Sequence, residues 1–401
     1  MGMIPQLGVV LKPSDRPHGH SSPVRRRGVP YNGEAMSPRP LRRQIGQLLI
    51  AGFAGPSVPV ELRALAGEFD LGGVILFGRN VESPEQVAEL AFEARRLGTD
   101  APAWVSVDQE GGRVARLRAP FTEWPPMATL GRSRDELLAE RFGRALAAEL
   151  RVVGISLDYA PVLDVLTNPA NPVIGDRALA DRADLVGRLG QRIVRELQAQ
   201  GVAACGKHFP GHGDTTTDSH VELPVVEHPP DRLNAVELVP FKAAIAADVA
   251  FIMTAHVLVT ALDAEHPATL SRRIVHGLLR QELGYGGVIV SDDLDMKAIA
   301  TLHSVGDAAV AAIGAGCDAV LICGADIDRH VKVLEALIHA VESGSLPVGR
   351  VEDALARQRR MKERLLSPLS DEPRPPAASA LRAVVGCDAH RAIAEEMAAY
   401  L

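Results

Sequence analysis

The chain has 401 residues, of which 43 are Lys or Arg and 50 are Asp or Glu, so its formal net charge is −7 at pH 7. The hydrophobic fraction of 47% is large enough for a substantial core, which excludes a disordered chain, a collagen-like repeat and a small disulfide scaffold. The acidic balance argues against a nucleic-acid or anionic-membrane surface, because either partner would require a basic face.

Residues 1–40 are rich in proline, carry the run Arg25-Arg26-Arg27 and lack a periodic apolar pattern. This composition predicts a disordered basic tail. The apolar run at 8–11 is too short for a signal segment, and no run in the chain reaches the ~20 residues of a membrane span. The four cysteines contain no C-x-x-C pair and are typical of reduced, buried thiols. We therefore expect a cytoplasmic protein with no membrane span.

From residue 41 onward, short apolar runs alternate with helical patterns. In chain order the predicted strands are 48–52, 73–77, 103–107, 155–159, 202–206, 251–254, 287–290 and 319–323. The helical patterns between and after them cover 84–97, 134–152, 182–200, 230–247, 272–283, 305–316 and 329–343. Ser83-Pro84-Glu85 is a helix start signal, and Gly154, Gly201 and Gly284 follow three of the periodic runs, where helices end.

Strands that alternate with helices of this length indicate parallel βαβ units. Seven or eight such units predict an α/β fold, namely a (β/α)₈ TIM-type barrel that forms a single catalytic domain over residues 41–366. An open doubly wound sheet is the alternative, but no G-x-G-x-x-G follows the strand at 73–77. The proline-rich stretch 367–376 is interpreted as a linker, and 380–401 as a short extension with one helix at 390–401 that docks on the barrel or forms a swapped arm.

Four polar clusters begin where predicted strands end. They are Asp108–Arg113, Lys207–Asp214, Ala255-His256 and Ser291–Asp293. In a barrel the carboxyl ends of the strands converge on one rim, where active sites lie. A single polar strand end is often a helix cap, but four ends dense in Asp, His, Lys and Arg predict a functional site.

Asp292 follows an apolar strand, where a carboxylate can stabilise or attack a cationic carbon centre. The structural alternative is a helix N-cap, a role that Asp293 and Asp295 fit better because they lie nearer the helical stretch at 296–301. The Gly- and Thr-rich segment 211–220 is predicted to be a mobile loop. In an extended segment Asp218 and His220 share a side, so the carboxylate can orient the imidazole for proton transfer. The alternative is a solvated loop histidine.

The same region permits a metal-binding interpretation. Its ligand set would be His208, His212, Asp214, Asp218 and His220. The spacing of His208 and His212 suits one helical face, but Pro210 and Gly211 between them disfavour a helix. We therefore expect neither a metal nor an organic cofactor.

Three strings, KHFPGHGDTTTDSH (207–220), DQEGGRVARL (108–117) and SDDLDM (291–296), closely resemble the β-N-acetylglucosaminidases of glycoside hydrolase family 3. GVILFGRN (73–80), APVLDV (160–165) and NPVIGDRA (171–178) fit the same family, and the similarity covers roughly residues 40–365. The long 207–220 string is highly specific, whereas the SDDL string alone is weak. The first 40 residues have no counterpart in short family members, and 385–391 resembles the entry to the second domain of longer ones.

The resemblance implies a barrel enzyme with a retaining mechanism. In it Asp292 matches the nucleophile that forms a covalent glycosyl-enzyme, and His220 matches an unusual general acid/base with Asp218 as its partner. The residues that match those holding the sugar are Asp108, Arg116, Arg177, Lys207 and His208.

The expected activity is removal of terminal, non-reducing N-acetylglucosamine from small carbohydrate or muropeptide substrates, in peptidoglycan recycling. A β-glucosidase and a phosphorylase of the same family remain open, the latter because a histidine need not repel phosphate as a carboxylate base would. A metal-dependent hydrolase and an inactive sugar-binding barrel also remain open. The sequence does not predict the oligomeric state.

Overall fold

The computed structural model describes residues 38–219, 222–370 and 375–401. Eight parallel strands form a closed barrel in the order β1-β12-β11-β9-β7-β6-β3-β2. Ile50 of β1 pairs with Gly73 on one side and with Leu321 on the other, so the sheet has no free edge and the open-sheet alternative is wrong. The barrel strands are β1 (Leu49–Gly52), β2 (Gly73–Leu76), β3 (Trp104–Val107), β6 (Leu157–Asp158), β7 (Ala203–Phe209), β9 (Phe251–Thr254), β11 (Val288–Asp293) and β12 (Ala319–Ile322).

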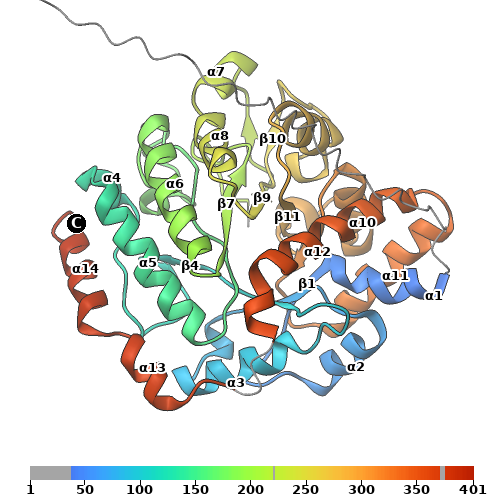
Figure 1. Ribbon diagram of the computed structural model, residues 1–401. Coiled ribbons are helices and arrows are strands. Elements are labelled where there is room, and N and C mark those ends of the chain that lie inside the picture. Colours follow the sequence, from blue (N-terminus) through green and yellow to red (C-terminus); the bar gives the residue numbers. More distant parts are fainter. Residues whose placement is uncertain (1–37, 220–221, 371–374) are drawn as a thin grey trace, which may run out of the picture. The chain divides into compact units, whose positions relative to one another are not determined.

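The predicted TIM-type barrel and all eight predicted strands are confirmed, with ends that differ by up to three residues. Their apolar runs are continuous because a barrel strand is covered on both faces, by side chains inside and by helices outside. The interior is filled by large residues, among them Trp104 and Phe251, whose rings meet edge to face at 5.2 Å. Figure 1 shows the helices arranged around this central sheet.

Except for the helix at 60–69, which was not predicted, the main outer helices follow the predicted patterns, with α3 capped by Ser83, whose Oγ accepts from the Gln86 amide at 3.1 Å. The predicted helix 230–247 is divided at Val236 and Glu237, and 272–283 is a π-helix over Arg273–Glu282. The main outer helices are α2 (Val60–Phe69), α3 (Pro84–Arg95), α5 (Glu136–Val152), α6 (Ala183–Ala199), α7 (Pro230–Ala235), α8 (Leu238–Ala246), α10 (Val305–Ala315) and α11 (Ile327–Glu342). Shorter elements are α1 (Pro38–Gln44), α4 (Ala128–Ser133), α9 (Lys297–Ala300), and the β-pairs β4 (Gln109–Gly111) with β5 (Val114–Ala115) and β8 (Val225–Val226) with β10 (Leu258–Val259).

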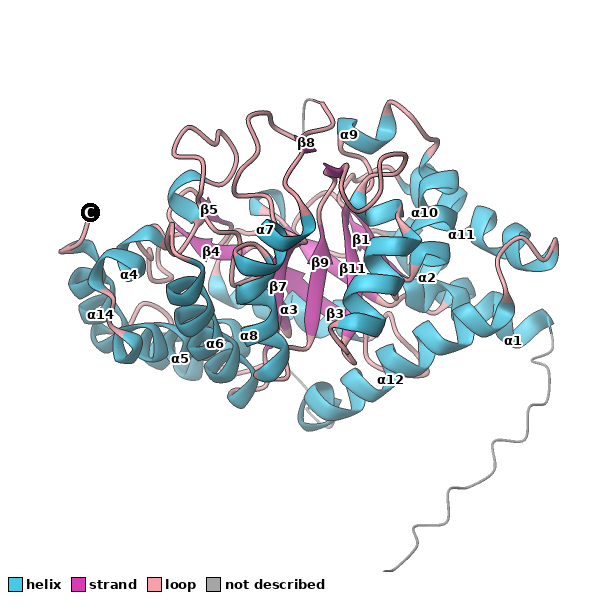
Figure 2. Ribbon diagram, turned by 90° about the horizontal axis from the view of Figure 1, so that it is seen from above, coloured by secondary structure: helices cyan, strands magenta, loops and turns pink. Residues whose placement is uncertain are grey.

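The helix α12 (Val348–Ser370), which the sequence patterns did not predict, covers the amino end of the barrel (Figure 2). Gln358 accepts a hydrogen bond from the Trp104 indole at 3.1 Å. The Lys362 ammonium donates to Gln47 Oε1 at 2.7 Å and to the Gly72 carbonyl at 2.9 Å, just before β1 and β2. The helix therefore closes the end opposite the polar strand ends, where Met361, Leu365 and Leu366 pack on the barrel interior. It extends four residues into the expected linker.

The C-terminal segment docks on the barrel of the same chain. It consists of α13 (Ala378–Val384) and α14 (Asp388–Ala398), and both figures place α14 beside α5. Leu381 and Met397 are buried in this contact. The predicted C-terminal helix is thus confirmed with an earlier start, whereas α13 was missed. The predicted tail falls almost wholly outside the described residues, since α1 begins at Pro38.

Within the part of the chain that the structure describes, no helix combines the length and the apolar character needed to cross a bilayer. All four cysteines are free, as expected, and Cys205 and Cys317 are buried.

Burial lowers the pKa of Lys362 to about 7, although Asp70 nearby opposes the shift. An ordinary lysine titrates near 10.5, so between pH 7 and 10.5 the unfolded chain binds a proton that the folded chain does not. This difference makes the free energy of unfolding rise with pH. We predict that Lys362→Met flattens this rise by about 1 kcal/mol between pH 7 and 8.5, measured by urea unfolding. Equal slopes in variant and wild type would contradict the shifted pKa.

Candidate functional site

The ends of β3 and β7 bring two predicted site residues into direct contact. Asp108 follows β3, and Lys207 is the fifth residue of β7. The Lys207 ammonium donates to Asp108 Oδ1 at 2.8 Å, and Arg116 donates to Asp108 Oδ2 at 3.2 Å. Lys207 is buried, whereas the side chains of Asp108 and Arg116 keep 16% and 28% exposure, so this carboxylate and guanidinium face accessible space at the carboxyl end of the barrel.

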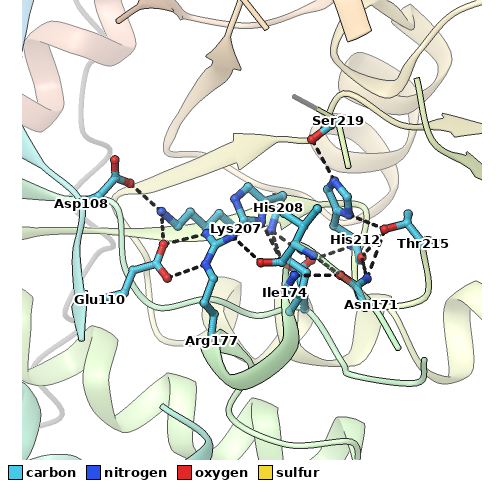
Figure 3. Close-up of polar contacts among 12 residues, drawn as sticks. Asp108, Glu110, Asn171, Ile174, Arg177, Lys207, His208, His212, Thr215 and Ser219 are labelled. Carbon is cyan, nitrogen blue, oxygen red and sulfur yellow. Dashed lines mark hydrogen bonds and ion pairs between the residues drawn. The ribbon is translucent and has the colours of Figure 1, made fainter. Parts of the chain in front are cut away.

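Glu110 completes the cluster, although the sequence analysis did not select it. Its carboxylate accepts two hydrogen bonds from Arg177, at 2.8 and 2.9 Å, and pairs with the Lys207 ammonium at 2.6 Å (Figure 3). Bidentate Arg–carboxylate geometry is both strong and directional. Four of the five residues predicted to hold a sugar, Asp108, Arg116, Arg177 and Lys207, are therefore connected through Asp108 and Glu110.

Burial opposes ionisation of both carboxylates, yet the neighbouring cations hold them charged. Arg177 and Lys207 lower the pKa of Glu110, and Lys207 and Arg116 lower that of Asp108. The two carboxylates in turn raise the pKa of Lys207 despite its burial. The cluster is thus a fixed array of charges that presents Asp108 and Arg116 toward solvent.

His208, the next residue along β7, points to a different partner. Its Nδ1 lies 2.7 Å from Asp164 Oδ2, and the backbone amides of His208 and His212 also donate to this carboxylate, at 3.2 and 2.7 Å. Asp164 is fully buried, and the two histidines lower its pKa against the effect of burial. A single ionised carboxylate therefore fixes the turn between β7 and the following loop.

His212 anchors the loop that carries Asp218. Its Nδ1 lies 2.8 Å from Thr215 Oγ1 and its Nε2 lies 3.1 Å from Ser219 Oγ (Figure 3). Burial and the neighbouring His208 lower its pKa to about 4, so the imidazole is neutral at pH 7. The Thr215 hydroxyl donates to the His212 carbonyl at 3.1 Å, which leaves Nδ1 as a donor to Thr215 and Nε2 as the acceptor from Ser219.

The end of this loop lies against the segment that follows β11. The Ser219 carbonyl accepts from the Ala298 amide of α9 at 3.2 Å, and the Asp218 carbonyl accepts from the Glu222 amide at 3.0 Å. Asp218 is half-buried. His220, the predicted acid/base, lies outside the described residues, but both of its described neighbours in sequence, Ser219 and Glu222, are held by these backbone contacts.

Asp292 lies at the carboxyl end of β11 and is half-buried. Its Oδ1 accepts from the Asp293 amide at 2.8 Å. Burial alone would raise the pKa of Asp292, but His256, His208 and Lys207 lie close enough to lower it below the usual range. The structure therefore brings Asp292, His208 and Lys207 to one rim, with the carboxylate ionised.

The N-cap role expected for Asp293 and Asp295 is wrong, because the N-cap residue of α9 is Met296 and no side chain caps that helix. Asp293 has another structural part. Its Oδ1 accepts from the amides of Asp295 and Cys323, at 3.1 and 3.0 Å. Burial, with help from Asp295 and Asp292, raises its pKa to about 6. His256 Nε2 lies 3.0 Å from the Asp293 carbonyl and Nδ1 lies 2.8 Å from Thr269 Oγ1, so this histidine supports the loop that carries Asp292.

Three of the five residues considered for a metal, namely Asp214, His208 and His212, contact other partners, and His220 lies outside the described residues. Asp214 accepts from Thr167 Oγ1 and pairs with His228, both at 2.6 Å, while His208 and His212 are engaged as above. Among the residues that the structure describes, no group of three His, Cys, Asp or Glu side chains is arranged to hold a metal ion.

The sequence model of the Glycosyl hydrolase family 3 N terminal domain matches residues 40–361. The chain belongs to glycoside hydrolase family 3. This membership confirms the predicted resemblance and identifies the protein as a glycosidase, which agrees with its charged site at the carboxyl end of a TIM-type barrel.

Family 3 relatives of different lengths resemble the chain. Beta-hexosaminidase A from Pseudoalteromonas piscicida is 35% identical over 368 residues, which make up 85% of this chain and 60% of that relative. The structure of a glycoside hydrolase family 3 beta-N-acetylglucosaminidase from Paenibacillus sp. str. FPU-7 superposes with a TM-score of 0.85 at 41% identity and covers 90% of this chain and 68% of that one. NagZ from Neisseria gonorrhoeae, in complex with N-trifluoroacetyl-D-glucosamine, gives a TM-score of 0.71 at 32% identity over 88% of this chain and 97% of that one.

Sequence reasoning missed Glu110, Asp164 and His256 as parts of the site. Glu110 and His256 lay within the strand-end clusters, and Asp164 within the 160–165 string, so each had a positional signal. Their roles as internal partners depend on which side chains meet across neighbouring strands, which residue spacing does not specify.

We predict that Glu110→Gln lowers the free energy of unfolding by about 3 kcal/mol, because it leaves the buried Lys207 and Arg177 with an uncharged partner. Urea unfolding at pH 7 measures the loss. Asp176→Asn is the matched control, since Asp176 pairs with Arg113 at the surface and its loss should cost well under about 1 kcal/mol. Similar losses in the two variants would show that the buried cluster contributes little to stability.

Proposed function

We propose that the protein is a retaining exo-β-N-acetylglucosaminidase that removes terminal, non-reducing N-acetylglucosamine. The observation that carries this proposal is the ionised Asp292 carboxylate at the rim, within electrostatic reach of His208 and Lys207. A charged carboxylate is the form that can bond to the anomeric carbon. The names of the family 3 relatives, including β-N-acetylglucosaminidases and a NagZ bound to an acetylglucosamine analogue, support the choice of sugar.

In the proposed reaction, His220 protonates the glycosidic oxygen while an Asp292 oxygen attacks the anomeric carbon and the bond to the leaving group breaks. Water then attacks the same carbon, His220 accepts its proton, and the bond to Asp292 breaks. Asp218 orients His220 and favours its protonated form. These steps use side chains of this chain and water alone. The net result is hydrolysis with retention of configuration.

The charge array has a consistent part in this proposal. Asp108 and Arg116 offer an acceptor and donors to sugar hydroxyls. Lys207 and His208 lie on β7, which stands between β3 and β11 in the strand order of the barrel. Arg177 contributes indirectly in this proposal, because its guanidinium is bound to the Glu110 carboxylate. A bidentate contact fixes a donor in direction as well as distance, which suits the recognition of a rigid sugar ring.

For the natural substrate we propose peptidoglycan fragments in the cytoplasm, with the sugar at the non-reducing end. The test is release of N-acetylglucosamine or glucose from aryl β-glycosides by purified protein, with and without inorganic phosphate. We expect N-acetylglucosamine, first released as the β-anomer in NMR spectra. Glucose release would favour a β-glucosidase, a sugar 1-phosphate would favour a phosphorylase, and no turnover together with sugar binding would favour an inactive barrel.

We predict that Asp292→Ala lowers kcat by at least about 10³-fold, because no covalent glycosyl-enzyme can form. Incubation with a slow fluorinated N-acetylglucosaminide should add one sugar mass to the wild type and none to the variant, as measured by intact mass spectrometry. Asp295→Asn is the control, since Asp295 lies three residues after Asp292, pairs with Arg329 of α11, and should label normally. A labelled Asp292→Ala protein would refute the assignment.

We predict that His220→Ala slows hydrolysis by about 10²–10⁴-fold for poor leaving groups and far less for activated aryl ones, because only poor leaving groups need a proton. Asp218→Asn should give the same pattern with smaller losses. The exposed His266, paired with Asp263, supplies the control variant His266→Ala, which should leave both rates unchanged. Equal losses on both kinds of substrate would assign His220 a structural part instead.

A further inference from the structure

The C-terminal segment 375–401 lies beyond the residues matched by the family, which end at 361, and it packs on the outer helices α3, α4 and α5. The contact is built on Glu149, a residue of α5 whose side chain is 3% exposed. Its carboxylate accepts from the Gly386 amide at 2.9 Å and from His390 Nδ1 at 3.0 Å. These two bonds fix the turn before α14 and the first turn of that helix on α5.

The same carboxylate also holds the loop that follows the β4–β5 hairpin. Glu149 accepts from the Thr122 amide at 3.0 Å and from the Thr122 hydroxyl at 2.6 Å. One buried anion therefore joins three parts of the chain, namely α5, the 118–126 loop and the C-terminal segment. Hydrogen bonds are directional, so this arrangement specifies the position of the loop more closely than apolar packing would.

Trp124 adds a second, independent link between the loop and the C-terminal segment. Its ring lies 5.1 Å from that of Phe142 on α5 and 6.5 Å from the imidazole of His390. Trp124 is buried, and its carbonyl accepts from the Gly112 amide of the hairpin at 2.8 Å. A Cβ on Gly111 would lie 2.8 Å from the Pro125 carbonyl oxygen, which shows how closely the loop covers the hairpin.

The hairpin covered in this way carries three residues of the charge array. Asp108 precedes it, Glu110 lies on β4, and Arg116 follows β5. The Gln109 side chain closes the hairpin internally, because its Oε1 accepts from the backbone amides of Arg116 at 2.8 Å and Leu117 at 3.0 Å. The hairpin therefore moves as one piece, and its contact with Trp124 sets where that piece lies relative to Lys207 and Arg177.

We propose that Glu149 and His390 are positioning residues for the substrate-binding array, and that the C-terminal segment serves as a buttress that keeps the Asp108–Arg116 hairpin in register with Lys207. The proposal rests on the proposed function for its effect on the sugar. It requires that loosening the segment weakens sugar binding more than it slows the chemical step, because Asp292 and the 212–219 loop lie on other strands. A segment that only stabilises the barrel would leave binding unchanged in any variant that stays folded.

Two variants of the full chain separate these roles. Glu149→Gln keeps the size of the side chain but turns an amide donor toward the backbone N–H of either Thr122 or Gly386, each of which needs an acceptor. His390→Phe keeps a ring beside Trp124 and removes the hydrogen bond. The matched control is Glu396→Gln, which breaks the exposed ion pair between Arg141 of α5 and Glu396 of α14 without touching the loop. Each protein is assayed at least about 10 °C below its own melting temperature, so that global unfolding does not contribute to the result.

The first readout does not depend on activity. Amide hydrogen exchange of peptides covering 108–117 should become at least about tenfold faster in Glu149→Gln and His390→Phe and stay unchanged in Glu396→Gln. The second readout is the sugar: KM for the aryl β-N-acetylglucosaminide and the calorimetric Kd for N-acetylglucosamine should both rise about tenfold, while kcat changes less than about twofold.

The proposal is overturned if the folded variants exchange like the wild type over 108–117. It is also overturned if exchange accelerates while KM and Kd stay fixed, or if Glu396→Gln produces the same changes. Should the wild type neither bind nor hydrolyse the acetylglucosaminide, the proposed function fails. The exchange data then still decide whether the C-terminal segment holds the hairpin.

Discussion

The ammonium of Lys207, shared between Asp108 and Glu110, is the interaction on which the rest of the site depends. A lysine this deeply buried would lose its proton or destabilise the fold if its partners were absent. Both carboxylates arrive from β3 and the β4 strand after it, whereas Lys207 comes from β7, so the barrel must close with the correct register for the charges to meet. The bidentate Arg177 then balances Glu110 and leaves Asp108 and Arg116 facing accessible space.

The two ends of the barrel handle buried polarity in different ways. At the amino end, α12 places Lys362 against Gln47 and the Gly72 carbonyl with no carboxylate in direct contact, and burial lowers its pKa. At the carboxyl end, Lys207 sits between two carboxylates, and its pKa is raised. At pH 7 the ammonium of Lys362, which closes the amino end, is therefore only partly protonated, whereas that of Lys207, which organises the site, stays charged. The direction of each shift follows from whether anions accompany the burial.

The hydrogen-bond partners of the histidines near the site show that several of them have structural roles, whereas a chemical role is proposed for His220. His212 is neutral because it is buried beside another histidine, and its two nitrogens connect Thr215 and Ser219. His208 is tied to Asp164, and His256 to the carbonyl before the α9 loop. Three imidazoles thus fix loop ends with hydrogen bonds. This leaves the rim ordered around Asp292, where a reacting group gains from being held in place.

Local patterns in the sequence determined the barrel and much of the site's composition. Continuous apolar runs of four to five residues, with caps such as Ser83 between them, specify strands and helices through neighbours in the chain, and all eight barrel strands could be predicted in this way. The position of Asp108, Lys207 and Asp292 in the carboxyl-terminal half of a strand or just after it also follows from chain order, because parallel strands of a barrel share one carboxyl rim.

The tertiary structure alone decided which partners those residues have and which elements close the fold. Glu110 meets Arg177 across 67 positions of sequence, and Glu149 meets His390 across 241, distances over which residue type says nothing about contact. Helix α12 was missed because its mixed pattern of charged and apolar residues becomes interpretable only once the open amino end of the barrel exists. Sequence spacing specifies local geometry, whereas the pairing of buried charges depends on how the strands register when the barrel closes, and only the folded chain determines that.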